Sequence, residues 1–260
     1  MAWLSDRRLP GPLLRPLLRG YVRAYGVDLS EAAEPLAAFP TFNAFFTRRL
    51  RDGARPIATE RGLVVSPSDS RLQTVGRVPP DARLEQIKGR SYTLTALLGD
   101  VAEAARFAEG VHATLYLSPS MYHRVHVPVD GRITGWRYLP GRLYPVNAMA
   151  VRSVEGLFTV NERVVVTMET DDLGPVAAVM VGATNVGRMT LSFAGLVTNA
   201  GGPPAAVVLD PPLPVRRGDE LGAFNLGSTV VLLAADPTLE PAGVHEGQIV
   251  RVGQPLWRKA

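Results

Sequence analysis

Short apolar runs that end at glycine or proline fill the second half of this sequence, and they constrain its fold more than any other feature. The runs include RVHVPV, RVVVTMET, VAAVMVGA and STVVLLA. Their β-branched residues favour strands, and the glycine, proline or Asp-Gly pair after a run favours a turn. We therefore predict an α+β fold that is predominantly β, with antiparallel barrel-like or sandwich-like sheets.

Helices are expected mainly toward the N-terminus. Residues 31–50 place apolar side chains near helical spacing around Pro40, and residues 91–108 are predicted to be helical with a break near Gly99. Because 46% of the 260 residues are hydrophobic and only 20% are charged, the chain can bury a substantial core. We predict one domain over residues 1–260.

The net charge of +4 is concentrated at the N-terminus. Residues 1–55 hold nine arginines and five acidic residues, so the rest of the chain is neutral. A basic segment that also carries leucines suits an anionic membrane surface, and we interpret residues 1–30 as a membrane-associating lead. A solvated helix would have a similar composition, and Pro10, Pro12 and Pro16 argue against one long amphipathic helix. Nucleic acid is a less favoured partner, because the rest of the chain has no basic excess.

The residue inventory narrows the chemistry. The chain has no cysteine and only two lysines, Lys88 and Lys259, which excludes disulfides, thiolate metal sites and a cysteine nucleophile. A lipoyl-type or biotinyl-type carrier needs a lysine at a hairpin tip, and neither lysine lies in such a turn. The nucleophile candidates are then serine and threonine, and the candidate bases are four histidines and the carboxylates. We expect no metal.

Three short segments hold the candidate residues. His123 and His126 lie three residues apart in SPSMYHRVHVP, and the alternation of Val125, Val127 and Val129 turns His126 to the opposite face of its strand. Asp69 in SPSDS and Ser228 in LGST each fit an ordinary turn when taken alone. The chain has no G-x-S-x-G motif, which disfavours an α/β-hydrolase.

Taken together and in order, these segments resemble the bacterial phosphatidylserine decarboxylases. The resemblance covers most of residues 42–234, and its segments include FNAFFTRRLRDGARPI, SPSDS, YHRVHVP, LPGRLYPVN, VNER, VGATN and LGST. LGST alone is weak evidence for this family. When the other segments precede it in the family's order, the combination is specific for the family.

The resemblance implies a self-cleaving enzyme. Ser228 would attack the Gly227 carbonyl, with His126 as general base and Asp69 as the carboxylate that orients this histidine. The cut would give a β chain of residues 1–227 and an α chain of residues 228–260, which stay together as a heterodimer. Ser228 would become a covalent pyruvoyl group that forms a Schiff base with phosphatidylserine and releases phosphatidylethanolamine and carbon dioxide. His123 is the candidate proton donor.

Further expectations follow from the same resemblance. They are peripheral attachment to the cytoplasmic face of the cell membrane, with phosphatidylserine and an anionic membrane surface as partners; further dimerisation is left open. Ser70 stands where the family usually has glycine, so the turn after Asp69 must accept a side chain. Two other functions remain as alternatives: a serine hydrolase that uses Asp69, His126 and Ser228, and a non-catalytic lipid-binding module.

Overall fold

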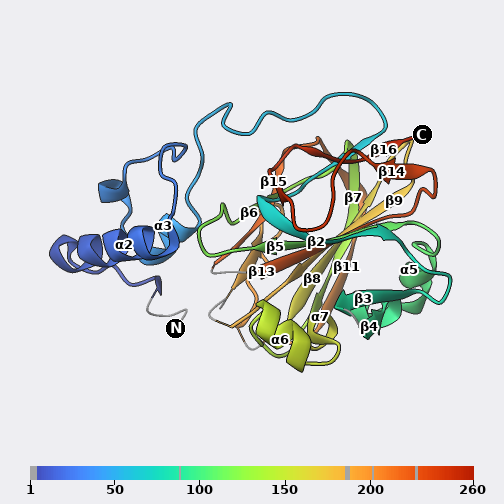
Figure 1. Cartoon of the computed structure of the whole chain (residues 1–260), viewed down its shortest axis with the longest axis horizontal. Helices are drawn as coiled ribbons and strands as arrows, with labels where there is room; N and C mark the ends of the chain where they lie inside the picture. The colour runs from blue at the N-terminus through green and yellow to red at the C-terminus, as the bar shows by residue number, and fades with distance from the viewer. Residues whose placement is uncertain (1–4, 88, 185–187, 201, 226–227) are drawn as a thin grey trace.

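An eight-stranded antiparallel sheet forms the centre of the protein. The computed structural model describes residues 1–260 except 1–4, 88, 185–187, 201 and 226–227 (Figure 1). In spatial order the sheet contains β11 (Ala205–Val215), β7 (Gly131–Leu139), β8 (Arg163–Glu169), β9 (Pro175–Val181), β13 (Ser228–Ala234), β5 (Val111–Leu117), β2 (Ser70–Arg77) and β15 (Ile249–Val250). The predominantly β prediction is confirmed. Because β11 and β15 are free ends of the order, this sheet does not close into a barrel.

Three small sheets complete the β structure. They are β1 (Leu63–Val65) with β16 (Pro255–Lys259) and β14 (Leu239–Pro241); β10 (Met189–Leu191) with β12 (Glu220–Phe224) and β6 (Arg124–His126); and the pair β3 (Arg83–Ile87) and β4 (Arg90–Thr93). The sheet that contains β6 carries the YHRVH segment.

The sequence of β13 explains its central place. All of its residues, STVVLLA, are buried, and it pairs with β5 on one side and β9 on the other. A strand covered on both faces needs a continuous apolar run, unlike the alternating pattern of a half-exposed strand. β13 is therefore part of the core and also begins at Ser228.

Four short helices lie between strands along the chain: α4 (Leu94–Leu98) and α5 (Val101–Ala105) between β4 and β5, and α6 (Ala148–Ser153) and α7 (Leu157–Val160) between β7 and β8. Thr93 and Asp100 cap α4 and α5, and Gly99 ends α4 with a left-handed φ of 70°. The predicted break near Gly99 is confirmed, since glycine enters this region without steric cost. The helix predicted from residue 91 is wrong at its start, because residues 91–93 belong to β4.

The N-terminal residues form a helical lobe beside the sheets, shown in blue in Figure 1. It contains α2 (Gly11–Tyr25), the 3₁₀ turn η1 (Leu36–Ala38) and α3 (Phe42–Phe46), and it has its own hydrophobic cluster. The prediction of a helix over residues 31–50 is wrong. Phe39, before Pro40, is extended with ψ 123°, because a proline disfavours the helical conformation of the residue before it.

The argument against one long N-terminal helix is also wrong. α2 runs unbroken for 15 residues, with a proline in its first turn and Pro16 inside it. Pro12 lies where a backbone N–H needs no helical partner, so only Pro16 removes a hydrogen bond. Among the described residues, no helix has the length and apolarity needed to cross a bilayer.

Candidate active site

The register of the central sheet brings Asp69 and Ser228 to the same end. Tyr116 of β5 pairs with Arg71 of β2 on one side and with Thr229 of β13 on the other. β2 and β13 both run antiparallel to β5. Asp69, just before β2, and Ser228, at the start of β13, therefore lie on the same side of the row formed by Arg71, Tyr116 and Thr229. Two strand spacings of about 4.8 Å separate the backbones of β2 and β13, which is roughly 10 Å.

Ser228 is fully buried at the first position of β13, opposite Leu117 of β5. Its hydroxyl oxygen has no hydrogen-bond partner among the described residues. Buried hydroxyls nearly always have a partner, so an orphan of this kind calls for an explanation. Gly227, the other half of the predicted cleavage site, lies outside the described residues.

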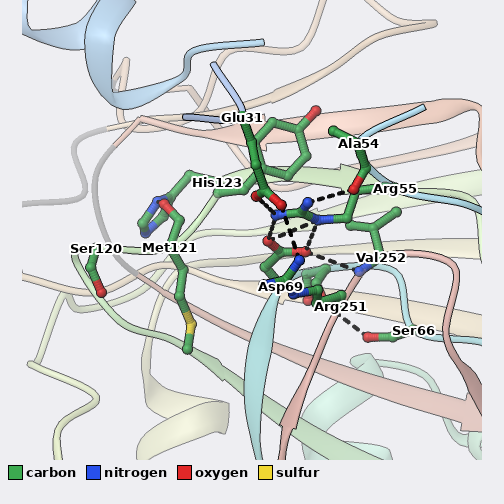
Figure 2. A network of polar contacts seen from close by, with 12 residues as sticks. Glu31, Ala54, Arg55, Ser66, Asp69, Ser120, Met121, His123, Arg251 and Val252 are labelled. Atoms are coloured by element: carbon green, nitrogen blue, oxygen red, sulfur yellow. Dashed lines mark hydrogen bonds and ion pairs between the residues drawn. The ribbon is translucent and has the colours of Figure 1, made fainter. Parts of the chain in front are cut away.

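Asp69 is held by a bidentate ion pair with Arg55. Arg55 donates from Nε to Oδ1 at 2.9 Å and from Nη2 to Oδ2 at 2.5 Å, and the Val252 N–H donates to Oδ1 at 3.0 Å. The same Nη2 lies 2.8 Å from Glu31 Oε2. Figure 2 shows Arg55 between Glu31 and Asp69, with Val252 beside the Asp69 carboxylate. Burial opposes the charge of Arg55, but the two carboxylates outweigh it and raise the pKa of this guanidinium.

His126 projects from β6 toward a carbonyl and a phenol. Its Nδ1 lies 2.7 Å from the Gly218 oxygen, and its Nε2 lies 3.0 Å from the Tyr122 hydroxyl. A carbonyl can only accept, so Nδ1 carries the proton. Burial lowers the pKa of His126 below its ordinary value of 6.5, while the bond to Gly218 opposes the shift. The neutral ring therefore accepts a hydrogen bond from the Tyr122 hydroxyl at Nε2, and Nε2 is the ring nitrogen that can act as a base.

The three residues of the relay expected from the sequence are not joined to one another by hydrogen bonds among the described contacts. The His126 N–H donates to the Pro67 oxygen at 2.7 Å, which places the histidine beside the loop that carries Asp69. Among the described contacts, however, Asp69 bonds to Arg55 and Val252, and His126 bonds to Gly218 and Tyr122. The orienting role of Asp69 stays a prediction, and the group that orients the imidazole here is the Gly218 carbonyl.

His123 occupies a separate, fully buried position. Its Nδ1 donates to the Met121 oxygen at 2.8 Å, its ring centroid lies 4.0 Å from that of Phe46, and its Nε2 has no partner among the described residues. Burial lowers the pKa of His123 to about 3, so the ring is neutral. In Figure 2 its ring lies apart from the Arg55 and Asp69 pair.

Sequence reasoning missed several residues around these histidines. Arg48, which from the sequence counted only as one of the N-terminal arginines, is buried, donates to the Ser120 oxygen at 3.2 Å and lies over the Phe45 ring with its guanidinium carbon 5.6 Å from the centroid. Tyr122, four residues before His126, could have been noticed as a hydroxyl within the YHRVH segment. Arg55 lies in the segment FNAFFTRRLRDGARPI, but nothing in that segment names Asp69 as its partner, and Gly218 gave no local signal because His126 is 92 residues away.

A cavity of about 430 Å³ opens beside His126. Tyr122, Gly218, Glu220 and Arg55 contribute to its wall. His126 is thus reachable from solvent, whereas Ser228 and His123 are fully buried. Among the described residues, no three His, Asp or Glu side chains gather in a way that could bind a metal ion.

Ser70 fits its turn without backbone strain. It begins β2, and its hydroxyl lies 2.7 Å from that of Ser68. Among the described non-glycine residues, positive φ angles occur only at Ala82, Glu109 and Asn199. The position after Asp69 therefore does not require glycine in this chain.

The sequence of this chain is similar to a family of known proteins. The family model for phosphatidylserine decarboxylase matches residues 42–258. A phosphatidylserine decarboxylase proenzyme of Anaeromyxobacter sp. (strain K) is 48% identical over 262 residues, which cover 97% of this chain and 90% of that relative. The protein of the same name from Acidovorax ebreus (strain TPSY) is 48% identical over 251 residues, covering 95% and 87%, and the one from Myxococcus xanthus (strain DK1622) is 40% identical over 252 residues, covering 95% and 88%. The chain belongs to the phosphatidylserine decarboxylase family.

Proposed function

We propose that this chain is a precursor that cuts itself between Gly227 and Ser228, converts Ser228 into a pyruvoyl group and decarboxylates phosphatidylserine to phosphatidylethanolamine. The family supports the reaction and substrate. The observation that carries the finer proposal is Ser228 itself: it begins a core strand at the same end of the sheet as Asp69, and its buried hydroxyl has no partner among the described residues.

The surroundings of Ser228 fit a pyruvoyl group. In the conversion Oγ of Ser228 would leave with the Gly227 carboxylate and Cβ would become a methyl group, so residue 228 would keep no unpartnered hydroxyl in this buried position; the keto oxygen, which only accepts hydrogen bonds, would stand on Cα in place of the nitrogen. The ketone, once formed, supplies the carbonyl that condenses with the substrate amine and withdraws electrons as carbon dioxide leaves. No lysine is needed at the site, in keeping with a chain that has only Lys88 and Lys259.

His126 would act at Nε2 during self-cleavage. The Ser228 hydroxyl attacks the Gly227 carbonyl carbon, and its proton passes through Nε2 to the departing Ser228 nitrogen, which leaves an ester and a free amine. Removal of the Ser228 α-proton then expels the Gly227 carboxylate, and water releases the nitrogen as ammonia. The Tyr122 hydroxyl is hydrogen-bonded to Nε2 in the structure. For Nε2 to accept the Ser228 proton, this hydroxyl must rotate away or transfer the proton itself.

His123 would serve the decarboxylation step at its own Nε2. This nitrogen is buried without a partner, while Nδ1–H is fixed by the Met121 carbonyl. The Met121 contact sets the tautomer, so Nε2 is the atom left to take up a proton and return it to the product. Phe46 packs on the ring and limits its rotation.

Intact-mass analysis of the purified protein tests the self-cleavage. Two species are expected, residues 1–227 and a blocked piece of residues 228–260. Ser228→Ala should remain one chain and lack decarboxylase activity. A single uncleaved species of the unaltered protein that retains an ordinary serine would contradict the proposal, and a fluorophosphonate adduct on that serine would favour a serine hydrolase.

We also propose that the N-terminal lobe docks on an anionic membrane from which the substrate is taken. On α2, Leu13 and Leu17 are one turn apart and are 64% and 51% exposed. Arg15, Arg19 and Arg23 are exposed on the same helix. Exposed leucines beside arginines suit insertion at the headgroup level of anionic lipids. The lobe also reaches the site, because the Tyr21 hydroxyl donates to the Pro119 oxygen at 3.0 Å.

A further inference from the structure

The direction of the Asp69 carboxylate is decided by groups other than His126. Arg55 engages both of its oxygens, and the Val252 N–H takes a further position on Oδ1. A planar guanidinium that meets a carboxylate at two points fixes its orientation as well as its charge. Both ring nitrogens of His126 are meanwhile occupied by Gly218 and Tyr122.

Glu31 contacts both of the segments that bind Asp69, the one that contains Arg55 and the one that contains Val252. One of its carboxylate oxygens lies 2.8 Å from Arg55, and the other lies 3.0 Å from Arg251, the residue before Val252. Its own backbone is tied down, since the Arg51 N–H donates to the Glu31 oxygen at 2.9 Å. Glu31 and Arg55 lie before the predicted cut, whereas Arg251 and Val252 lie after it, so this cluster joins the two pieces.

We propose that Arg55, held in place by Glu31, is the positioning residue that balances the charge of the Asp69 carboxylate and orients it for self-cleavage. The inference rests on the function proposed above. Asp69 then acts on His126 through the electrostatic attraction of its negative charge for the imidazolium formed when Ser228 gives up its proton. Arg55 touches neither Ser228 nor the bond that breaks, so it acts through Asp69.

The other charged groups around Asp69 do not replace Arg55. Arg48 attracts the Asp69 charge from a distance, and Tyr122 and His126 both sense that charge. His126 additionally faces Glu220 and Arg124, which have opposite effects on its pKa. Only Arg55 forms an ion pair with Asp69 among the described residues. Without it, the Asp69 carboxylate would keep the Val252 N–H as a donor but no cation in contact among the described residues.

The pH dependence of self-cleavage is the test. Full-length precursor is made by a short cell-free translation, shifted to a series of pH values, and followed by the appearance of the 228–260 piece. Cleavage needs neutral His126, whose pKa is lowered by burial, so the rate of the unaltered chain should fall only below pH 6.5. In Arg55→Gln the Asp69 charge, which favours protonated His126, is no longer balanced by a guanidinium, so the fall in rate (the acid limb of the profile) should begin at a pH about one unit or more higher, with a roughly tenfold lower rate there and recovery at high pH.

Two further variants separate charge, geometry and folding. Arg55→Lys keeps the charge but loses the two-point contact, so the acid limb should stay in place while the rate falls about fivefold or more. Arg132→Gln breaks an exposed arginine–aspartate ion pair, with Asp171, and it should leave both rate and pH profile unchanged. If Arg55→Gln does not accumulate as folded protein, Arg55→Lys decides: the unaltered rate in that variant would overturn the proposal.

Failure of this inference differs from failure of the proposed function. If the unaltered precursor does not cleave, the proposed function is wrong. If it cleaves, and Arg55→Gln shows the same pH profile at either the same or a uniformly lower rate, Arg55 has only a structural role and the inference is overturned. Glu31→Gln should lower the rate severalfold without moving the acid limb upward, because Arg55 remains; an unchanged rate would remove Glu31 from the proposal.

Discussion

At the scale of single residues, the site depends on which polar atoms have partners. His126 has both ring nitrogens engaged, whereas Ser228 Oγ and His123 Nε2 are buried without partners among the described residues. Unpartnered buried polar atoms are costly, so folding stability alone does not explain them. The proposed chemistry assigns a role to each of these two atoms.

Chemical rescue tests the access to His126. Removing the ring in His126→Ala joins its space to the adjacent cavity of about 430 Å³, so added imidazole should reach the vacated position and restore part of the self-cleavage. His126→Phe fills that space and should show no response to imidazole. The readout is the intact mass of the precursor with and without imidazole. Equal rescue of both variants, or rescue of neither, would contradict the assignment of His126 as an accessible base.

At the scale of elements, α2 is the clearest departure from an ordinary surface helix. It buries Leu14 and Leu18 in the lobe's own cluster and still exposes two further leucines. Its neighbour α3 carries Phe46, which packs on His123. The surface proposed to meet the membrane is therefore connected through two short helices to a residue of the site.

Substitution of the exposed leucines tests membrane docking. The double variant Leu13→Ser with Leu17→Ser should weaken sedimentation with vesicles containing phosphatidylserine by about tenfold or more, since each buried leucine contributes roughly 1.5 to 3 kcal/mol. Self-cleavage should be unchanged. Val101→Ser removes a comparably exposed residue, 72% accessible on α5, and should leave binding as it was. Equal binding by the double variant would exclude this face of α2.

Salt provides an independent check of the arginines on the same lobe. Binding to anionic vesicles should weaken as salt rises above about 0.1 M, where exposed charges are screened over roughly 10 Å. Binding that persists at high salt but is lost in the leucine variant would assign attachment to apolar insertion alone.

At the scale of the whole molecule, the position of the predicted cut has a structural consequence. Residues 228–260 contribute β13 at the centre of the large sheet, β15 at its edge, and β14 and β16 in a second sheet. β13 is buried along its whole length, and Trp257 of β16 is buried as well. One broken peptide bond removes none of these contacts.

The two pieces should therefore stay together after cleavage. Size-exclusion chromatography under native conditions should give one peak that contains both pieces, and concentrated guanidinium should separate them. Val231→Asp introduces an unpaired charge at a fully buried position of β13 and should prevent folding, whereas Arg258→Gln at an exposed position of β16 should have no effect. Spontaneous release of the small piece in native buffer would contradict this arrangement.

The sequence by itself determined the β-rich class, the break at Gly99, the family resemblance and the candidates Asp69, His126, His123 and Ser228. These features depend on local composition or on the order of short motifs, both of which are visible along the chain. Only the tertiary structure decided that α2 is continuous, that residues 31–50 are not one helix, and that Asp69 binds Arg55 while His126 binds Gly218. The partner of a charged or polar side chain is set by strand register and by loops that approach from far away. Gly218 is 92 residues from His126 and Val252 is 183 residues from Asp69. No local pattern records such a pairing, because it exists only once the sheets have formed.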